Sequence, residues 1–229
     1  MRLRRRTTQQ ARVVLQAASL LLGYPDDRLL ADLPVIEAAV GELPAGPARD
    51  RLTAFLAHLR ATPLRELQEH YVSVLDRRRR CSLYLTWWTD GETRRRGLSL
   101  ARLKELYRSH GRELDPGELP DFLPVVLEFG ATVDLERGLE LLSGHRAGLE
   151  LLRLALSDLG SPYASPVEAV CSLLPGPSPA DEAQARALAR TGPPLEGVGL
   201  AGYGSTGAAA LGETADLGPT SLLPSGARR

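Results

Sequence analysis

Few side chains in this sequence are spaced as a catalytic or metal site would require. The four histidines are His58, His70, His110 and His145. No two of them are four residues apart and none belongs to an HExxH motif, so they do not predict a zinc site. The two cysteines lie far apart, which excludes a CxxC motif and a disulfide framework. We therefore expect a protein that is not an enzyme and that holds no metal or cofactor.

A glycine-rich stretch, Gly202–Gly207, has the G-x-G-x-x-G form of a dinucleotide-binding loop. That motif works only where a strand leads into the loop and a helix follows it. No strand pattern precedes Gly202, so we do not predict dinucleotide binding. Walker-type and G-x-S-x-G motifs are absent from the sequence.

The densest charge in the chain is carried by two arginine runs, Arg77–Arg80 and Arg94–Arg96. They flank the aromatic residues Tyr84, Trp87 and Trp88, in a chain whose 28 Lys and Arg balance 28 Asp and Glu. If Arg77–Arg80 is helical, at least one guanidinium approaches the core and must pair with a carboxylate, since an unpaired buried charge is costly. Such runs are typical of a solvated face with ion pairs, or of a surface that recognises acidic groups, phosphate or nucleic acid.

Three carboxylates surround the start of a predicted helix in the segment 117–129. Glu118 and Asp121 precede the helix, and Glu128 lies within it among apolar residues. Asp121 suits the N-cap position and Pro124 the first turn, where the missing N–H costs nothing. Carboxylates beside exposed apolar side chains would suit a basic, partly apolar peptide. A capped helix start explains Asp121 and Pro124 without any ligand, so both interpretations stay open.

Apolar residues at helical spacing run through most of the chain and define the elements that must position these groups. Helices are expected at 7–22, 48–60, from about 63, at 93–110, from about 122, at 149–159, from 162 or 166 to about 174, and at 180–190. Residues 81–88 have strand propensity, but we expect one or two buried helical turns there, because no partner strand is evident. Hairpin, βαβ and repeat patterns are absent, so the predicted fold class is all-α.

The two ends of the chain differ from its middle. The N-terminal arginines and apolar run could suggest a signal peptide, but polar residues recur every three or four positions from Gln9 to Ser19, which favours a surface helix of a folded domain. No apolar run is long enough to predict a membrane span. Residues 191–229 contain 9 Gly and 4 Pro, too many for packed helices. We predict a single helical-bundle domain, 1–190, and a flexible Gly/Pro-rich C-terminal tail, 191–229.

Several stretches resemble those of the NarJ-type chaperones, the assembly proteins for the molybdenum cofactor-containing subunit of respiratory nitrate reductase. They are Leu21–Pro25, Tyr71–Thr86, Thr89–Gly97 and Glu118–Phe129. The resemblance covers roughly residues 10–175 and implies an all-α fold. The wider family often has Asp-His where this chain has Asp121-Phe122, so the resemblance does not imply a histidine-dependent role here.

The resemblance also implies a function. The chain would bind the apo form of the catalytic subunit of respiratory nitrate reductase, partly through the N-terminal segment of that subunit, which resembles a degenerate twin-arginine signal. It would keep that subunit competent for molybdenum cofactor insertion before membrane attachment. It would act in the cytoplasm beside the cofactor-delivery machinery, without binding nucleic acid and without stable insertion into a membrane.

The expected partner-peptide surface combines the residue patterns with the resemblance. Its first-choice residues are Tyr71, Glu118, Asp121, Phe122 and Glu128. Its second-choice residues are Arg77, Arg78, Arg79, Arg80, Trp87 and Trp88. The alternative function is a nucleic-acid- or phosphate-binding regulatory protein that uses the arginine runs, and a hydrolase with a dispersed site is a third.

Removing residues 191–229 should leave the melting temperature nearly unchanged, because a segment of this composition has little apolar surface to bury. Thermal unfolding of the full chain and of a chain that ends at residue 190, followed by circular dichroism, would measure the difference. A large drop in melting temperature would show that the segment packs on the domain.

Overall fold

Helices make up the regular structure of the chain in a computed structural model, which describes residues 2–115 and 117–191. The α-helices are α1 (Arg2–Leu21), α2 (Asp27–Gly41), α3 (Pro47–Ala61), α4 (Leu64–Tyr71), α5 (Leu85–Asp90), α6 (Arg94–Ser109), α7 (Leu123–Thr132), α8 (Leu135–Gly144), α9 (Arg146–Asp158), α10 (Ala164–Cys171) and α11 (Glu182–Thr191). A π-helix, η1 (Val72–Asp76), continues α4, and a 3-10 helix, η2 (Arg79–Cys81), follows it. No β-strand occurs in the described residues, which confirms the all-α prediction.

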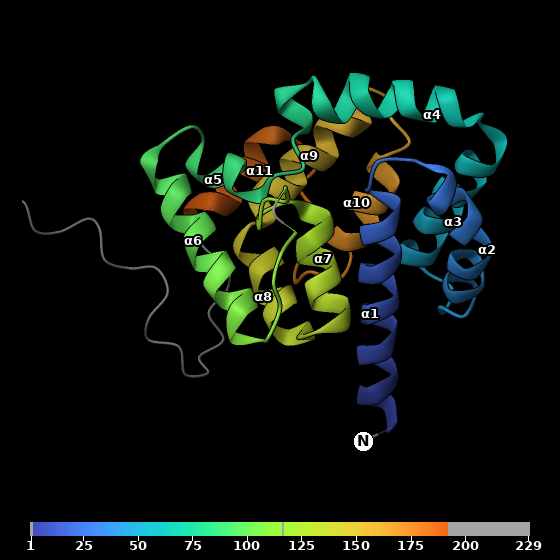
Figure 1. Cartoon of the computed structure of the whole chain (residues 1–229), viewed down its shortest axis with the longest axis horizontal. Helices are drawn as coiled ribbons and strands as arrows, with labels where there is room; N and C mark the ends of the chain where they lie inside the picture. Colours follow the sequence, from blue (N-terminus) through green and yellow to red (C-terminus); the bar gives the residue numbers. More distant parts are fainter. Residues whose placement is uncertain (1, 116, 192–229) are drawn as a thin grey trace, which may run out of the picture. The chain divides into compact units, whose positions relative to one another are not determined.

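Helix α1 lies between α7 on one side and the pair α2 and α3 on the other (Figure 1), and it also contacts α10. Its apolar residues Leu15, Ala18 and Leu21 are buried by these neighbours. A helix that is covered on several sides is a core element, and its apolar positions supply much of the burial that stabilises the fold.

The polar stripe of α1 bonds to α7 through two of its residues, whereas Gln9 is exposed, so the expectation of a surface helix holds only in part. Ser19 Oγ donates a hydrogen bond to the carbonyl oxygen of Pro124 at 2.8 Å, and Arg12 donates one to the carbonyl oxygen of Ala131. Ala131 lies in the last turn of α7, where carbonyls lack a partner within the helix. The stripe therefore binds two helices together. The helix also begins at Arg2, well before the predicted start near residue 7.

Helices α7 and α8 touch at two glycines. A Cβ atom added to Gly138 of α8 would lie 2.3 Å from the Cα atom of Gly130 in α7. Only glycines allow the two backbones to approach so closely in a packed interior. Helix α8 starts at Asp134, whose side chain accepts a hydrogen bond from the N–H of Arg137. This N-cap and its helix were missed by the sequence analysis.

A buried ionic cluster on α9 holds the segment that follows α10. Glu150 is fully buried and accepts a hydrogen bond from Ser178 Oγ at 2.8 Å. Arg146 donates to the carbonyl oxygens of Gly176 at 2.9 Å and Pro177 at 3.0 Å. These hydrogen bonds give the buried charges polar partners and hold the segment that precedes α11. Helix α11 then packs beside α9 (Figure 1). The predicted short helix at 180–190 is confirmed.

The predicted tail lies outside the described residues except for Thr191, the last residue of α11. The glycine-rich stretch 202–207 also lies outside them. The described helices fall within one compact unit, Met1–Pro194. None of the described helices combines the length and the apolar content that crossing a membrane requires.

Gly138→Ala should lower the free energy of unfolding by about 2 kcal/mol, because the added methyl group has no space between α7 and α8. Urea denaturation followed by circular dichroism measures this change. Gly144→Ala in the same helix is the matched control: an added Cβ meets no atom within 4 Å, so the variant should be neutral or slightly stabilised. Equal stability of Gly138→Ala and the unsubstituted chain would contradict the close contact.

Candidate functional site

Two distant stretches of the chain meet at the starts of α5 and α7. The N–H of Leu85 donates a hydrogen bond to the carbonyl oxygen of Asp121 at 2.9 Å. Tyr84 and Phe122 form an isolated antiparallel bridge, and their rings lie 5.4 Å apart. Because α5 starts only at Leu85, the buried helical turns predicted for 81–88 are confirmed only in part.

Asp121 is fully buried, with 0% of its surface exposed, and it contacts the first turns of α5 and α6. Its Oδ2 accepts hydrogen bonds from the N–H of Thr86 at 3.2 Å and from the Thr86 hydroxyl. Nη2 of Arg96 lies 3.6 Å from the same oxygen. The predicted N-cap role in α7 is wrong, because Phe122 holds that position and makes no side-chain cap. Asp121 therefore positions the two stretches from the interior.

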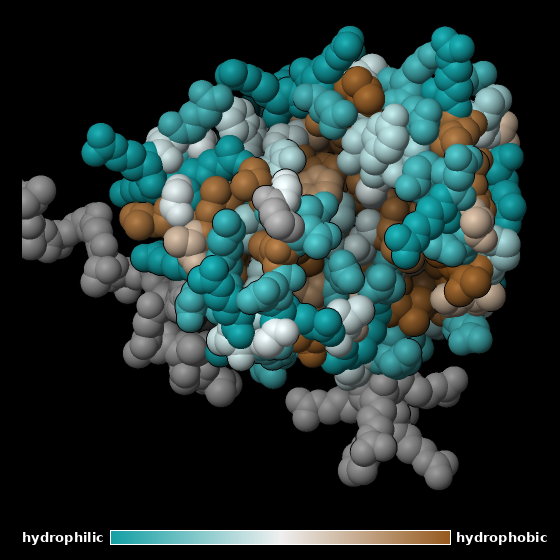
Figure 2. Space-filling view, in the orientation of Figure 1, coloured by the Kyte–Doolittle hydropathy of each residue, from teal (hydrophilic) through white to brown (hydrophobic). Residues whose placement is uncertain are grey.

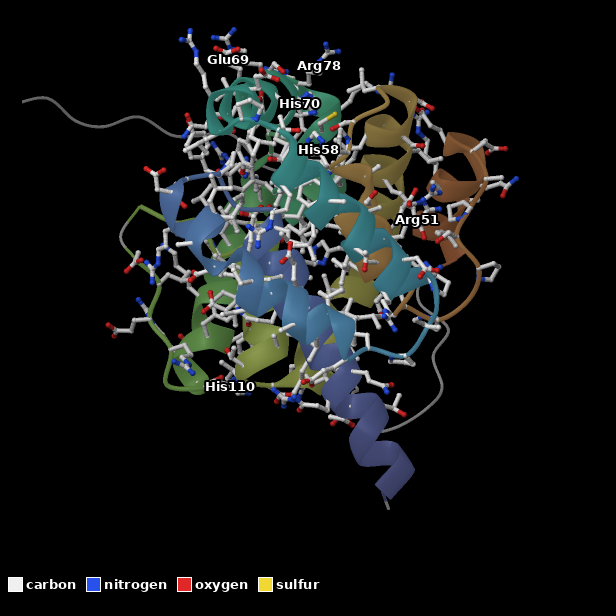
Figure 3. The ribbon with its side chains drawn as sticks, turned by 90° about the vertical axis from the view of Figure 1, so that its right-hand side faces the viewer. Arg51, His58, Glu69, His70, Arg78 and His110 are labelled. Atoms are coloured by element: carbon white, nitrogen blue, oxygen red, sulfur yellow. The ribbon has the colours of Figure 1, made fainter. Side chains whose placement is uncertain are left out.

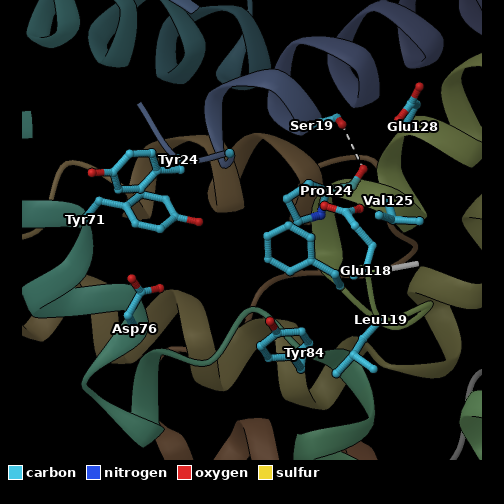
Figure 4. A pocket seen from close by; sticks show the side chains of 13 residues that line it. Ser19, Tyr24, Tyr71, Asp76, Tyr84, Glu118, Leu119, Pro124, Val125 and Glu128 are labelled. Atoms are coloured by element: carbon cyan, nitrogen blue, oxygen red, sulfur yellow. Dashed lines mark hydrogen bonds between the residues drawn. The ribbon is translucent and has the colours of Figure 1, made fainter. Parts of the chain in front are cut away.

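A groove of about 470 Å³ opens beside these paired stretches, between the end of α1, α4 with η1, and the start of α7 (Figure 4). Its lining residues are Ser19, Gly23, Tyr24, Tyr71, Asp76, Tyr84, Gly117, Glu118, Leu119, Phe122, Pro124, Val125 and Glu128. The hydrogen bond from Ser19 to Pro124, dashed in Figure 4, joins α1 and α7 at one wall. The groove depends on residues far apart in the sequence.

Aromatic rings line both sides of the groove (Figure 4). Tyr24 and Tyr71 pack edge to face with ring centroids 5.4 Å apart, and the Tyr71 hydroxyl donates to the carbonyl oxygen of Leu22 at 3.3 Å. Three of the seven large hydrophobic side chains exposed in the described residues lie here, namely Tyr24 (51%), Tyr84 (37%) and Leu119 (39%). On the face in Figure 2, apolar residues form patches among hydrophilic ones. Gathered exposed apolar side chains mark an interaction surface.

Three carboxylates, Asp76, Glu118 and Glu128, make the groove negative. None of them has an ion-pair partner in residues 2–115 and 117–191, and the described lining contains no arginine or lysine. Burial first, and then the nearby charge of Asp76, raises the pKa of Tyr71 above its usual value. Unneutralised carboxylates beside aromatic rings suit a ligand with both basic and apolar side chains.

Most of the first-choice residues come together at this groove: Tyr71, Glu118, Phe122 and Glu128. Asp121 is packed behind them and does not line it. Lining residues that the sequence analysis did not select include Tyr24, Asp76 and Tyr84. All three lie in the stretches that resemble the chaperone family, which is the signal that could have identified them. Peptide binding by this surface stays a prediction.

The second-choice arginines do not line the groove. All four residues of Arg77–Arg80 are exposed, so the guanidinium expected near the core if the run were helical is not found. The run spans the break between η1 and η2, so the continuous helix that the prediction required is not formed. Arg79 lies near Glu92 at 3.5 Å, and Arg80 pairs with Glu182. Exposed pairs of this kind contribute little to stability.

The two tryptophans have partners within the domain. Trp88 Nε1 donates to the carbonyl oxygen of Ser82 at 3.0 Å. Its side chain fills the space over Gly148, where an added Cβ would lie 2.5 Å from the Trp88 Cβ. The guanidinium of Arg79 lies 5.7 Å from the ring centre of Trp87, a cation–π contact. These contacts account for both rings without a ligand.

The histidines do not converge on a catalytic or metal centre. His58 and His70 lie near each other on α3 and α4, whereas His110 lies apart from them (Figure 3). His70 Nε2 is 2.9 Å from Ser161 Oγ, and partial burial lowers the pKa of His70. Within the described part of the chain, no group of three or more His, Cys, Asp or Glu side chains is placed to hold a metal ion.

Asp121→Ala should lower the free energy of unfolding by about 2 kcal/mol, since it removes the partner of Arg96 and of the Thr86 N–H. Urea denaturation measures the loss. Glu118→Ala is the matched control, because Glu118 is exposed. The free energy of unfolding of this variant should differ from that of the unsubstituted chain by less than about 0.5 kcal/mol. An Asp121→Ala variant that is fully stable but cannot bind peptide would contradict the positioning role.

Comparison with known proteins identifies relatives of this chain. Residues 42–168 match the family model described as nitrate reductase delta subunit. The chain is 32% identical over 157 residues to the Bacillus subtilis protein named probable nitrate reductase molybdenum cofactor assembly chaperone NarJ, a match that covers 69% of this chain and 85% of that protein. It is 33% identical over 154 residues to the Escherichia coli nitrate reductase molybdenum cofactor assembly chaperone NarJ, a match that covers 66% of this chain and 65% of that protein.

Two further similarities cover different shares of the matched proteins. The Mycobacterium tuberculosis nitrate reductase-like protein NarX is 45% identical over 159 residues, which is 69% of this chain but 24% of NarX, so the chain spans about a quarter of that relative. The fold also resembles a crystal structure from Archaeoglobus fulgidus that is described as a redox enzyme maturation protein. The match covers 71% of this chain and 92% of the Archaeoglobus fulgidus chain, with a TM-score of 0.52. Its 23% identity shows a shared fold alone. The chain belongs to the nitrate reductase delta subunit family and is a relative of the NarJ-type assembly chaperones.

Proposed function

We propose that this protein is a chaperone of respiratory nitrate reductase assembly. It binds the immature catalytic subunit, including the N-terminal segment of that subunit, and keeps it competent for molybdenum cofactor insertion before membrane attachment. It acts in the cytoplasm beside the cofactor-delivery machinery, catalyses no reaction and holds no cofactor itself. The names of the NarJ relatives from Bacillus subtilis and Escherichia coli support the assembly role.

The observation that carries the peptide-binding part of the proposal is the combination of charge and rings in the groove. Its described lining has three carboxylates without ion-pair partners and the rings of Tyr24, Tyr71, Tyr84 and Phe122. A segment with arginine or lysine beside apolar residues would gain charge-assisted hydrogen bonds and bury apolar area there. The same carboxylates would repel the phosphates of nucleic acid.

The size and exposure of the groove support a temporary interaction. A volume of about 470 Å³ takes a few side chains and not a folded domain. Charge pairs that stay close to water give moderate affinity. Release then follows if the finished subunit no longer exposes the segment, because a ligand shifts an equilibrium only through its different affinity for the two states.

The purified chain should capture the nitrate reductase catalytic subunit from cells that lack molybdenum cofactor in preference to the cofactor-loaded subunit. Asp76→Lys combined with Glu128→Lys should weaken this capture by about ten-fold, since attraction for a basic segment becomes repulsion. Both carboxylates are exposed and lack ion-pair partners within the described residues, so the fold should persist. Pull-down against a dilution series of the subunit measures the change.

Asp32→Lys is the matched control for this experiment. Asp32 is an exposed carboxylate on α2 that does not line the groove, so its reversal makes the same kind of charge change elsewhere. Thermal unfolding of every variant separates binding from folding. Undiminished capture by the Asp76/Glu128 variant, or equal capture of the empty and loaded subunits, would refute the proposal.

A further inference from the structure

A second hollow shares Tyr24 with the groove, and two arginines and one glutamate carry its charge. Its volume is also about 470 Å³. Its lining includes Tyr24, Arg65, Gln68, Glu69, Val72 and Arg77. Tyr24 lines both hollows and its side chain is half-exposed, and we call this shared ring the ridge. A bound chain that crosses this ring would reach both hollows.

The second hollow has a guanidinium available for a ligand. Arg77 is exposed and has no ion-pair partner among the described residues. Arg65 pairs with Glu69 at 2.9 Å, but both side chains are mostly exposed, and Glu69 lies at the outer surface of α4 (Figure 3). Such a pair contributes little and can exchange for another carboxylate. The hollow therefore favours a negative group, whereas the groove favours a positive one.

The local chain geometry explains why opposite charges lie so close together. Asp76 lines the groove and Arg77, its neighbour in sequence, lines the second hollow. Asp76 is the last residue of the π-helix η1, and the N–H of Arg77 closes it on the carbonyl oxygen of Val72 at 3.1 Å. Consecutive residues of a helical turn point in different directions. The end of η1 thus directs one charge to each side of the ridge.

The ridge itself is held in place by α4. Gln68 Nε2 donates a hydrogen bond to the carbonyl oxygen of Pro25 at 3.0 Å, and the Tyr71 ring packs against Tyr24. An aromatic ring shared by two charged hollows gives an apolar side chain of the ligand one place to pack. The order of charges in the ligand is then fixed relative to that side chain.

We infer that the client segment carries two charges of opposite sign, a basic residue for the groove and an acidic residue for the second hollow, with an apolar residue between them packed on Tyr24. This inference rests on the proposed function and specifies its ligand. A segment with basic residues on both sides of the apolar one would place a cation beside Arg77. Repulsion there gives specificity in addition to the attraction in the groove.

The test uses the full-length chain and two synthetic fluorescent peptides measured by anisotropy. The first peptide has arginine, then leucines, then glutamate, and the second has lysine in place of the glutamate. Arg77→Glu should lower the affinity for the first peptide about five-fold and raise the affinity for the second by a similar factor. Arg102→Glu is the matched control, since Arg102 is exposed on α6 and lines neither hollow. It should change neither affinity.

The outcomes separate this inference from the function on which it rests. Equal responses of both peptides to Arg77→Glu, with binding still weakened by Glu128→Lys, would overturn the two-charge ligand and leave the groove as the peptide site. No binding of either peptide, or binding unaffected by Glu128→Lys, would overturn both. Opposite responses of the two peptides to Arg77→Glu would establish the second hollow as part of the site.

Discussion

The buried carboxylate of Asp121 is the interaction on which the groove depends. It holds the first turns of α5 and α6 through Thr86 and Arg96, and its own backbone receives the N–H of Leu85. The other carboxylate oxygen, Oδ1, is buried without a hydrogen-bond partner among the described residues. That lack costs free energy, and the contacts of Oδ2 with Thr86 and Arg96 offset the cost. The adjacent Phe122 packs against Tyr84 and adds apolar surface to the groove.

A second constraint joins α1 to α7, and it also determines the shape of the groove. Ser19 and Arg12 donate hydrogen bonds from α1 to carbonyl oxygens at opposite ends of α7. The buried Oε1 of Gln16 lies on the same helix and has no hydrogen-bond partner within residues 2–115 and 117–191. Polar contacts between buried helices specify their relative position more strictly than apolar packing does. Because the groove opens where α1 ends and α7 begins, these contacts set the position of two of its walls.

The distribution of charge matters more for this protein than its total. The chain is neutral overall, but Arg146 and Arg153 are used to neutralise the buried Glu150, and other arginines pair with carboxylates at the surface. The groove carboxylates are left without such partners among the described residues. Their charge is therefore available to a ligand, whereas Arg146 and Arg153 neutralise a buried carboxylate of the fold.

The sequence by itself determined the helical class, most helix ends and the family, because apolar periodicity, Gly and Pro breaks and contiguous motifs are local properties. It also predicted Tyr71, Glu118 and Glu128 as residues of the peptide surface, since they lie in stretches that resemble the NarJ-type chaperones. Only the tertiary structure decided that Asp121 is buried and that Tyr24 completes the groove. Periodicity assigns a residue to one face of a helix, but what that face meets depends on contacts between segments far apart in the chain.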